Sequence, residues 1–386
     1  MNVVFISPHF PPQWALFCVA LKNEGANVLG MGDTVSPDLR PPLSDVLADY
    51  AYVPHLAHYD SALRAMGYLV WRHGKIHRLD SLNEHWLDLE GALREDFNVP
   101  GPRREETTRN RSKMGMKTIF RAAEIPCAPG ELVTGAEQVR RFAREHGLPL
   151  VFKPDTGVGA ARTWKVSSEK ELEEVLLRPL EGYIVEPFVQ GNITSFDGLT
   201  DAAGRIVFWT SHVYSQGVME TVTHGLDVHY WSRRQIPAQL EALGRKMVQA
   251  FGIRERFFHA EFFEHPDGSF TALEINIRPP GGFTVDMMNY ACDVDLYRLW
   301  ARVVTGKQVE DFRFERKYHS AHVSRRYTRN YRHPHEELVR RLGETMVVHH
   351  VLPPIFSQAM GDQMYLLRHQ DQEKLQEAIR LVETLG

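Results

Sequence analysis

The chain has 386 residues, of which 43% are hydrophobic and 24% are charged, and its formal net charge is −4. This length allows two or three domains with their own cores, and the balanced charge gives no support to a nucleic-acid or membrane surface. Cys18, Cys127 and Cys292 are widely spaced and odd in number, so no disulfide framework is indicated. The first residues do not resemble a signal peptide and no apolar run is long enough to cross a bilayer, so we expect a cytoplasmic protein.

The first hundred residues alternate short apolar strands with helices. Residues 2–7 have the pattern of a strand, 14–24 that of a helix ended by Gly25, and 26–33 that of a second strand. This order predicts a Rossmann-like sheet in an N-terminal domain over residues 1–103. No Gly-x-Gly-x-x-Gly motif follows the first strand, so a dinucleotide is not indicated.

A Pro- and Gly-rich turn at residues 99–102, followed by the charged stretch 103–111, predicts a domain joint. Residues 104–190 then mix helices with short strands, which predicts a small α+β lobe. The predicted helices are 112–124, 137–146 and 169–177, and the predicted strands are 149–154, 163–166 and 183–189.

Residues 191–310 are predicted to form a large lobe. The pattern predicts antiparallel strands at 194–201, 205–215 and 226–236, a helix at 239–251, a hairpin at 257–277 and helical chain over 283–304. Residues 311–386 mix strands with a final helix, and we expect them to pack on the large lobe as a C-terminal α+β extension. The whole chain is predicted to be an α/β protein made of α+β lobes.

The hairpin at residues 257–277 carries an unusual set of polar residues. An Asp-Gly turn joins its strands, which brings Glu261 on the first strand near Glu274 and Asn276 on the second. Residues two apart in a strand leave the same face, so Glu274, Asn276 and the following Arg278 share one side of the sheet.

Two carboxylates, an amide and a guanidinium on one sheet face fit a site for hard cations, because Mg²⁺ takes oxygen ligands and often shares them with substrate phosphates. The alternative is a polar sheet face turned towards solvent. The phenylalanines that crowd the same hairpin speak against this alternative, because they predict a buried setting.

Four features follow one another along the chain: Lys113 at a helix start, Lys153 at a strand end, an acidic strand end at 186–189, and the acidic hairpin. Their order and spacing resemble the ATP-grasp superfamily, which includes D-alanine–D-alanine ligase, biotin carboxylase and many carboxylate–amine ligases. The resemblance covers about residues 1–310 and implies an ATP-grasp fold. It rests most strongly on the segments SKMGMKTIFRAAEIPCAPG, LVFKPDTGVGAA, YIVEPFVQG and HAEFFEHPDGSFTALEINIRPPGG.

The resemblance implies that the chain binds ATP. Lys113 and Lys153 would bind its phosphates as point charges, and Glu186 would contact the adenine amino group. The small-residue loop at 156–161 would fold over the phosphates, where backbone N–H groups can approach closely. Taken alone, each of these residues also fits a solvated surface charge or an ordinary turn. Further residues implied in nucleotide binding are Thr156, Gly157, Gly159, Ala160, Pro187, Phe188 and Val189.

The resemblance also implies roles for the hairpin. Glu261, Glu274 and Asn276 would hold Mg²⁺, two ions in number, or Mn²⁺ in its place. Arg278 would orient the substrate carboxylate or stabilise the acyl phosphate, and its alternative role is a salt bridge that positions Glu274.

The chain departs from the superfamily pattern at two places. Residues 192–194 lack the carboxylate that binds the ribose in several relatives, and Asp197 is the residue that could compensate. The basic residue expected at the γ-phosphate has candidates in Arg233 and Arg234.

The resulting prediction is an ATP-dependent carboxylate–amine ligase that forms an amide through an acyl phosphate and releases ADP and phosphate. Its partners would be a small-molecule carboxylate, such as an amino acid, and an amine, with no nucleic acid and no membrane. The superfamily is often dimeric, so a homodimer is compatible with the resemblance. Candidate specificity residues, chosen by predicted position only, are His9, Asn83, Glu84, Tyr214, Ser215, Glu220 and His224.

Two other functions remain as alternatives. The N-terminal segment SPHFPP is similar to the start of some nucleotide-sugar glycosyltransferases, but such an enzyme needs a second Rossmann domain in the C-terminal half. A nucleotide-binding regulator or scaffold could keep the fold without turnover. The presence of every metal-ligand type in the hairpin disfavours this second alternative.

Overall fold

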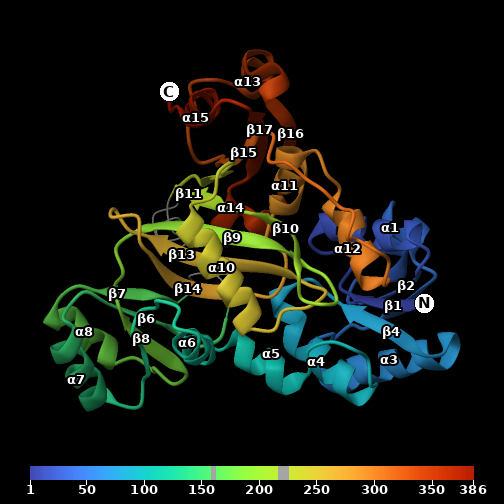
Figure 1. Ribbon diagram of the computed structural model, residues 1–386, viewed down its shortest axis with the longest axis horizontal. Helices are drawn as coiled ribbons and strands as arrows, with labels where there is room; N and C mark the ends of the chain where they lie inside the picture. Colours follow the sequence, from blue (N-terminus) through green and yellow to red (C-terminus); the bar gives the residue numbers. More distant parts are fainter. Residues whose placement is uncertain (158–161, 216–225) are drawn as a thin grey trace.

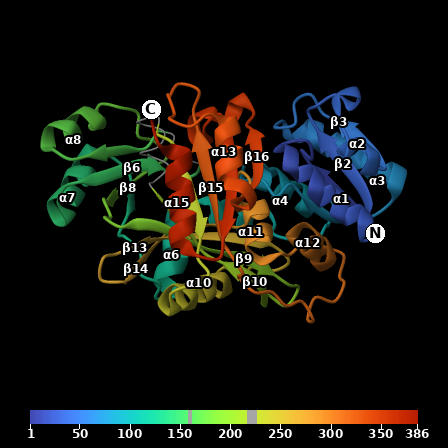
Figure 2. The same ribbon diagram turned by 90° about the horizontal axis from the view of Figure 1, so that it is seen from above.

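The computed structural model describes residues 1–157, 162–215 and 226–386. The described strands form a parallel sheet of four strands, an antiparallel sheet of four strands and an antiparallel sheet of nine. Figures 1 and 2 show the N-terminal domain and the small lobe at opposite sides of the molecule, with the large sheet and the C-terminal extension between them. None of the helices in the described ranges has both the length and the apolar composition of a membrane span.

The N-terminal domain contains β1 (Asn2–Ile6), α1 (Ala15–Asn23), β2 (Asn27–Gly32), α2 (Leu43–Val46), β3 (Asp49–Tyr52), α3 (Tyr59–His73), β4 (Ile76–Asp80) and α4 (Leu87–Asp96). Its parallel sheet has the order β3-β2-β1-β4. Val3 and Phe5 pack into a core with α1, whereas Val4 and Ile6 pack into a second core with α3. Apolar side chains leave both faces of β1, so helices cover both faces, and the predicted Rossmann-like sheet is confirmed.

The charged stretch that was expected to be a joint is helical. It forms α5 (Arg104–Arg111), which packs against α4 and against α6 (Lys113–Ala122). Acidic residues lie in the first turn of α5 and arginines in its last turn, which is the arrangement that the helix dipole favours. Helix α6 packs Met116 and Phe120 into the core of the large lobe. Two packed helices therefore connect the N-terminal domain to the small lobe.

The small lobe contains β5 (Glu131–Leu132), α7 (Ala136–His146), β6 (Leu150–Pro154), β7 (Trp164–Val166), α8 (Glu169–Leu176) and β8 (Tyr183–Pro187). Its sheet has the order β5-β8-β6-β7. Phe152 and Val185 are paired in register and pack under α7 and α8. The alternation of side chains along β6 and β8 turns Lys153 and Glu186 to the opposite face.

The large sheet contains β9 (Asn192–Thr200), β10 (Ile206–Thr210), β11 (His212–Tyr214), β12 (His229–Ser232), β13 (Phe257–Glu264), β14 (Phe270–Asn276), β15 (His319–Arg325), β16 (Met346–Val351) and β17 (Gln363–His369). Its order is β14-β13-β9-β11-β12-β15-β17-β16, and β10 pairs with β9. The strand predicted over 205–215 is thus two strands. The C-terminal extension does more than pack on the large lobe, because β15 pairs with β12 and continues its sheet.

The remaining helices are α10 (Ala238–Ala250), α11 (Thr284–Cys292), α12 (Leu296–Val304), α13 (His335–Leu342), α14 (Ser357–Met360) and α15 (Gln372–Glu383). Helix α10 covers one face of the large sheet, where its core contains Phe258 and Phe262 of β13. A Cβ atom on Gly244 of α10 would lie 2.2 Å from the ring of Phe196, so glycine lets the helix approach the sheet. The opposite face of β13 carries the polar residues described next.

Candidate active site

The two carboxylates of the hairpin lie on one face of the large sheet. In the register of β13 and β14, Glu261 is directly opposite Glu274, and His259 is opposite Asn276. A bulge next to this pair leaves Leu273 as an extra residue of β14 without changing the face of the acids. Asn276 Nδ2 donates to Glu274 Oε1 at 3.1 Å. The three predicted metal ligands therefore share one sheet face, as the alternation predicts.

A buried hydrogen-bond network lies beside Glu261. Its Oε1 is 2.9 Å from His259 Nε2, and His259 Nδ1 is 2.5 Å from Asp197 Oδ1. The other Asp197 oxygen accepts from Ser195 Oγ and lies 2.6 Å from His212 Nδ1. Burial lowers the pKa of His259, but the charge of Asp197 and the hydrogen bonds to Asp197 and Glu261 outweigh it and raise this pKa to about 10. His259 is therefore a cation that donates to both carboxylates.

The prediction that Asp197 compensates at the ribose is wrong. Its side chain is fully buried, and both of its oxygens are engaged by neighbouring side chains. Burial alone would raise the pKa of Asp197, but His259 and His212 hold it well below its usual range. The sequence shows Ser195 and Asp197 two apart on β9, and His259 and Glu261 two apart on β13, but not the strand order that joins them.

A buried group of two lysines and a glutamate lies on the inner face of the small lobe. Lys153 Nζ is 2.9 Å from Glu186 Oε2, and Lys117 Nζ is 2.9 Å from Glu186 Oε1. Lys117 also donates to the carbonyl of Ala128 at 2.7 Å. Burial raises the pKa of Glu186, but the two lysine charges outweigh it and lower this pKa. Both oxygens of Glu186 pair with lysines, and its contact with an adenine amino group stays a prediction.

Lys117 is a residue that the sequence reasoning missed. It lies four residues after Lys113, one turn further along α6, and its side chain is almost fully buried. That spacing places both lysines on one side of the helix. A second lysine at this spacing, in a helix whose other face is apolar, was the available signal.

Asp155, just after β6, ties the start of α6 to the small lobe. Its carboxylate accepts from Ser112 Oγ at 2.7 Å and from the Met114 N–H at 2.8 Å, and its carbonyl accepts from the Lys113 N–H at 2.9 Å. Lys113 therefore lies near Lys153, the lysine of β6. Burial lowers the pKa of Lys113, Glu274 raises it, and Lys153 lowers it further. Lys113 thus experiences charges from both the small lobe and the large sheet.

The predicted nucleotide contacts at the loop and at the strand end are described only in part. Gly159 and Ala160 lie outside the described residues, whereas Thr156 and Gly157 lie within them. The Phe188 N–H donates to the carbonyl of Pro149 at 2.9 Å, so this N–H is not free for adenine, which corrects the prediction.

The strand end still offers one main-chain donor and an aromatic surface. Within the described ranges, the Val189 N–H has no acceptor, so it remains a candidate donor to a base. The ring of Phe188 carries Lys165 Nζ 3.7 Å above its centre, which is a cation–π contact. Pro187 has no N–H to donate, so its role stays a prediction limited to packing and its carbonyl.

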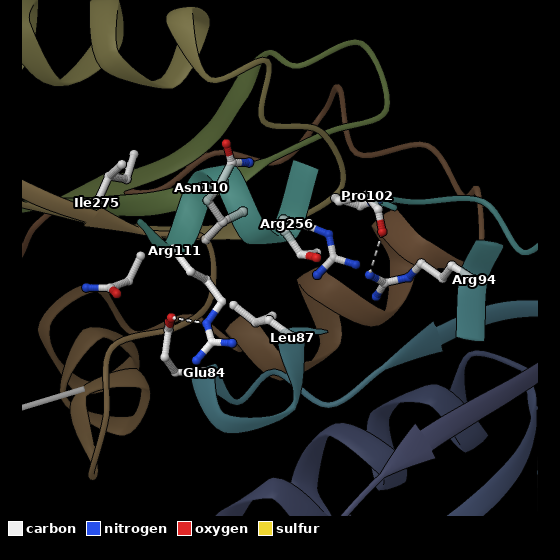
Figure 3. Close-up of a pocket in the computed structure, with 11 residues that line it drawn as sticks. Glu84, Leu87, Arg94, Pro102, Asn110, Arg111, Arg256 and Ile275 are labelled. Atoms are coloured by element: carbon white, nitrogen blue, oxygen red, sulfur yellow. Dashed lines mark hydrogen bonds and ion pairs between the residues drawn. The ribbon is translucent and has the colours of Figure 1, made fainter. Parts of the chain in front are cut away.

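Arg278 is held by an acid of the N-terminal domain. Its Nε donates to Glu84 Oε2 at 3.3 Å, and its Nη1 donates to the carbonyl of Pro279 at 2.9 Å. The other oxygen of Glu84 accepts from Arg111 Nε at 3.2 Å, a contact that Figure 3 shows. Glu84 is therefore shared by two arginines, which corrects its prediction as a free substrate ligand. The side chain of Asn83 caps the following turn by accepting from the His85 N–H.

Arg233 and Arg234 lie away from the acidic face, which is the face of the large sheet that carries Glu261 and Glu274. The guanidinium of Arg233 pairs with Glu264, which is three residues after Glu261 and so leaves the opposite face of β13. Arg234 donates to the carbonyls of Arg316 and Gln370. Both arginines line a hollow of about 1290 Å³ on that opposite face. The prediction that either reaches the γ-phosphate is therefore wrong.

The other proposed specificity residues lie in different places, and of the described ones Tyr214 lies beside the network of Asp197 and Glu261, where its hydroxyl bonds to Ser195. His9 Nε2 lies 3.3 Å from Asp33 Oδ1. Burial lowers the pKa of His9 more than the charge of Asp33 raises it. Burial raises the pKa of Tyr214 well above its usual value, and Ser215 Oγ accepts from the His229 N–H. Glu220 and His224 lie outside the described residues.

The acidic face fits a metal that shares its ligands with a bound phosphate. Within the described part of the chain, no group of three or more histidine, cysteine, aspartate or glutamate side chains is arranged to hold a metal alone. Glu261, Glu274 and Asn276 offer oxygen donors only, and the lysines lie nearby to bind an anion. Mg²⁺ prefers oxygen ligands and is usually held by one or two carboxylates plus substrate phosphates, so the residues fit it.

No protein-family model matches the chain. The L-arginine-specific L-amino acid ligase of Bacillus subtilis is 22% identical over 276 residues, which cover 67% of each chain. The crystal structure of an L-amino acid ligase from Bacillus licheniformis has a TM-score of 0.76 at 16% identity, and the match covers 98% of this chain and 96% of that one.

A third match is the biotin carboxylase domain of 2-oxoglutarate carboxylase from Hydrogenobacter thermophilus, solved as a dimer with MgADP, ADP and bicarbonate. Its TM-score is 0.69 at 15% identity, and the match covers 100% of this chain and 90% of that one. These likenesses confirm the fold expected from the sequence: the chain has the ATP-grasp fold found in carboxylate–amine ligases.

Proposed function

We propose that the protein is an ATP-dependent carboxylate–amine ligase that joins a small carboxylic acid, such as an amino acid, to an amine. The observation that carries this proposal is the meeting of opposite charges at one place. Glu261 and Glu274 lie together on the large sheet, and the charges of Glu274 and Lys153 both act on Lys113. Acids for cations beside lysines for phosphates are what a Mg²⁺–triphosphate complex needs.

The reaction would consist of two transfers. An oxygen of the substrate carboxylate attacks the γ-phosphorus, and the bond from that phosphorus to the β–γ bridging oxygen breaks, so ADP leaves. The amine nitrogen then attacks the acyl carbon and loses a proton, and the acyl–oxygen bond breaks to release phosphate. No side-chain nucleophile is needed, so positioning and electrostatic stabilisation supply the catalysis.

The residues of this chain would divide the work between two surfaces. Lys113 and Lys153 would bind the phosphates, and the pairing of Glu186 with Lys153 would hold that lysine in place. Glu261, Glu274 and Asn276 would hold Mg²⁺, which neutralises phosphate charge when it is bound.

Arg278 would bind the carboxylate that reacts. It lies two residues beyond Asn276, and its guanidinium can donate two parallel hydrogen bonds to a carboxylate or an acyl phosphate. Water must be kept from the acyl phosphate, and we assign that task to the loop at 156–161.

The proposal has four finer parts. We expect two Mg²⁺ ions, with Mn²⁺ able to replace them, because two metals can clamp both sides of a transferred phosphoryl group. We also expect a homodimer, since the biotin carboxylase domain named above is a dimer. We expect the protein to act in the cytoplasm. The domain boundaries at residues 103, 190 and 310 stay predictions.

The alternatives are less favoured. A glycosyltransferase needs a second Rossmann domain, and the described residues form only one parallel sheet. A regulator without turnover would bind ATP but release no ADP.

ADP release separates these possibilities. The purified protein is incubated with MgATP and a pool of the twenty common L-amino acids, and ADP and new products are measured by mass spectrometry. We expect ADP and an amide product in equal amounts. Tight ATP binding without ADP release would support the regulator, and release of a nucleoside diphosphate from a nucleotide sugar would support the glycosyltransferase.

A further inference from the structure

We infer that Glu84 is a positioning residue, which fixes the guanidinium of Arg278 from the N-terminal domain. This inference rests on the proposed ligase function, in which Arg278 binds the reacting carboxylate. It assigns to the N-terminal domain a part in setting up the reaction, although that domain supplies none of the proposed metal or phosphate ligands.

The first support is the charge around Glu84. Its side chain is 9% exposed, and each of its two oxygens pairs with a different arginine, Arg111 at 3.2 Å and Arg278 at 3.3 Å. Within the described ranges, Glu84 is the only acid paired with Arg278, whose other acceptor is the carbonyl of Pro279. Removing this one charge would leave two partly buried guanidinium groups facing a neutral side chain, which is costly at a buried site.

The second support is the way in which Arg278 is held. Glu84 uses the Nε side of the guanidinium and Pro279 uses Nη1. In the described part of the chain, Nη2 has no partner. A planar guanidinium held at Nε keeps a fixed orientation, and its Nη groups can still donate to a carboxylate. The contact therefore orients Arg278 without using up the donors that a substrate needs.

The third support is the connection to the phosphate-binding side. Arg111 is the last residue of α5, and it is followed directly by Ser112, which bonds to Asp155, and then by Lys113. Glu84 thus joins Arg278 to the segment that carries the first phosphate lysine. A cavity of about 20 Å³, enough for one water molecule, is lined by Glu84, Arg111 and Asn276 together (Figure 3).

The rival role for Glu84 is a simple tie between domains. A tie would affect stability, and its removal would change turnover whether or not Arg278 were present. A positioning residue acts through Arg278, so its removal should cost little once Arg278 has lost its guanidinium. A double-mutant cycle tells the two roles apart.

The test compares Glu84→Gln, Arg278→Gln and the double variant, with ADP release from radiolabelled ATP measured at saturating MgATP and pooled amino acids. We expect Glu84→Gln to lower kcat by about tenfold to a hundredfold while the KM for MgATP stays within about twofold. When Glu84→Gln is added to Arg278→Gln, kcat should fall by less than about a further twofold. Asp88→Asn is the matched control, because Asp88 is an exposed partner of Arg111, and it should leave kcat near that of the wild type.

Each outcome decides the inference. Wild-type kcat in Glu84→Gln, or equal losses with and without Arg278, would overturn it and leave the ligase function standing. Absence of ADP release from the wild type would remove the proposed function and this inference together. If Glu84→Gln does not fold, Arg111→Gln tests the same link from its other side. That variant should lose about threefold to tenfold in kcat, and this loss should also disappear without Arg278.

Discussion

Glu261 and Glu274 are directly opposed across the β13–β14 ladder, at the position where like charges destabilise a sheet most. His259 donates to Glu261 on one side, and Asn276 donates to Glu274 on the other. The histidine cation is already shared with Asp197, so the pair keeps a negative charge that a bound metal can neutralise. This surplus charge is the physical basis for the metal predictions below.

Glu274→Gln should stop phosphoryl transfer and leave the fold intact. The amide keeps the size of the side chain but loses the charge that binds a cation, so we expect ADP release to fall by at least about a hundredfold. Circular dichroism should match the wild type, and without Mg²⁺ the variant should melt no lower than the wild type, because a like-charge repulsion is removed. Glu264→Gln is the matched control, because Glu264 pairs with Arg233 on the opposite face, and its turnover should be nearly unchanged. Full activity in Glu274→Gln would remove the metal assignment.

Asp197→Asn should weaken both the fold and the response to Mg²⁺. It leaves the His259 cation beside a neutral amide, which costs about 3–5 kcal/mol at a buried ion pair. Glu261 loses its oriented partner, so the Mg²⁺ concentration for half-maximal ADP release should rise about tenfold or more. Ser195→Ala removes one donor to Asp197 but keeps the ion pair, and it should cost only about 1 kcal/mol. Unchanged melting and Mg²⁺ dependence in Asp197→Asn would contradict this role.

Much of the fold could be predicted from local patterns. Alternation along β13 and β14 correctly predicted one shared face for Glu261, Glu274 and Asn276, because the period of two is a property of the strand itself. The order of most strands and helices was also predicted correctly, although the strand expected over 205–215 is two strands. The helix over residues 104–111 was not predicted, since a run of charges resembles a linker until its ends are seen to match the helix dipole.

The errors in the site depend on partners far away in the sequence. Arg233 was assigned to the phosphates because nothing local reveals which face of the sheet it leaves. Asp197 was expected to be accessible, but the neighbouring strands β11 and β13 bring two histidines onto it. The pairing of Glu186 with Lys117 joins a strand of the small lobe to α6, a contact that only the packing of the domains creates.

Glu186→Gln should test whether this acid serves lysines or adenine. Loss of its charge leaves the buried Lys117 and Lys153 without their carboxylate partner, so stability should fall and the KM for ATP should rise by about tenfold. The KM for purine riboside triphosphate, which lacks the adenine amino group, should rise by the same factor as the KM for ATP, because Glu186 is engaged by the lysines. The KM values of both nucleotides would be measured by ADP release for the wild type and the variant. A larger factor for ATP than for the purine analogue would show that Glu186 contacts the amino group.

Asp286→Asn should stabilise the protein at neutral pH but not in acid. Burial raises the pKa of Asp286 from 3.8 to about 6, although the Tyr297 hydroxyl donates to its Oδ1 at 3.0 Å. A raised pKa means that the folded state favours the protonated acid, so stability falls as the pH rises from about 4 to about 6 and then levels off. At about 1.4 kcal/mol for each pKa unit, the ionised acid costs the fold about 3 kcal/mol above pH 6. Thermal melting should therefore place the variant a few degrees above the wild type at pH 7.5, and this gap should close towards pH 4.

Asp267→Asn is the control of opposite sign, because bonds from Ser269 lower the pKa of Asp267, and it should give no such gain. Equal melting of the Asp286→Asn variant and the wild type at every pH would mean that Asp286 keeps its charge at no cost.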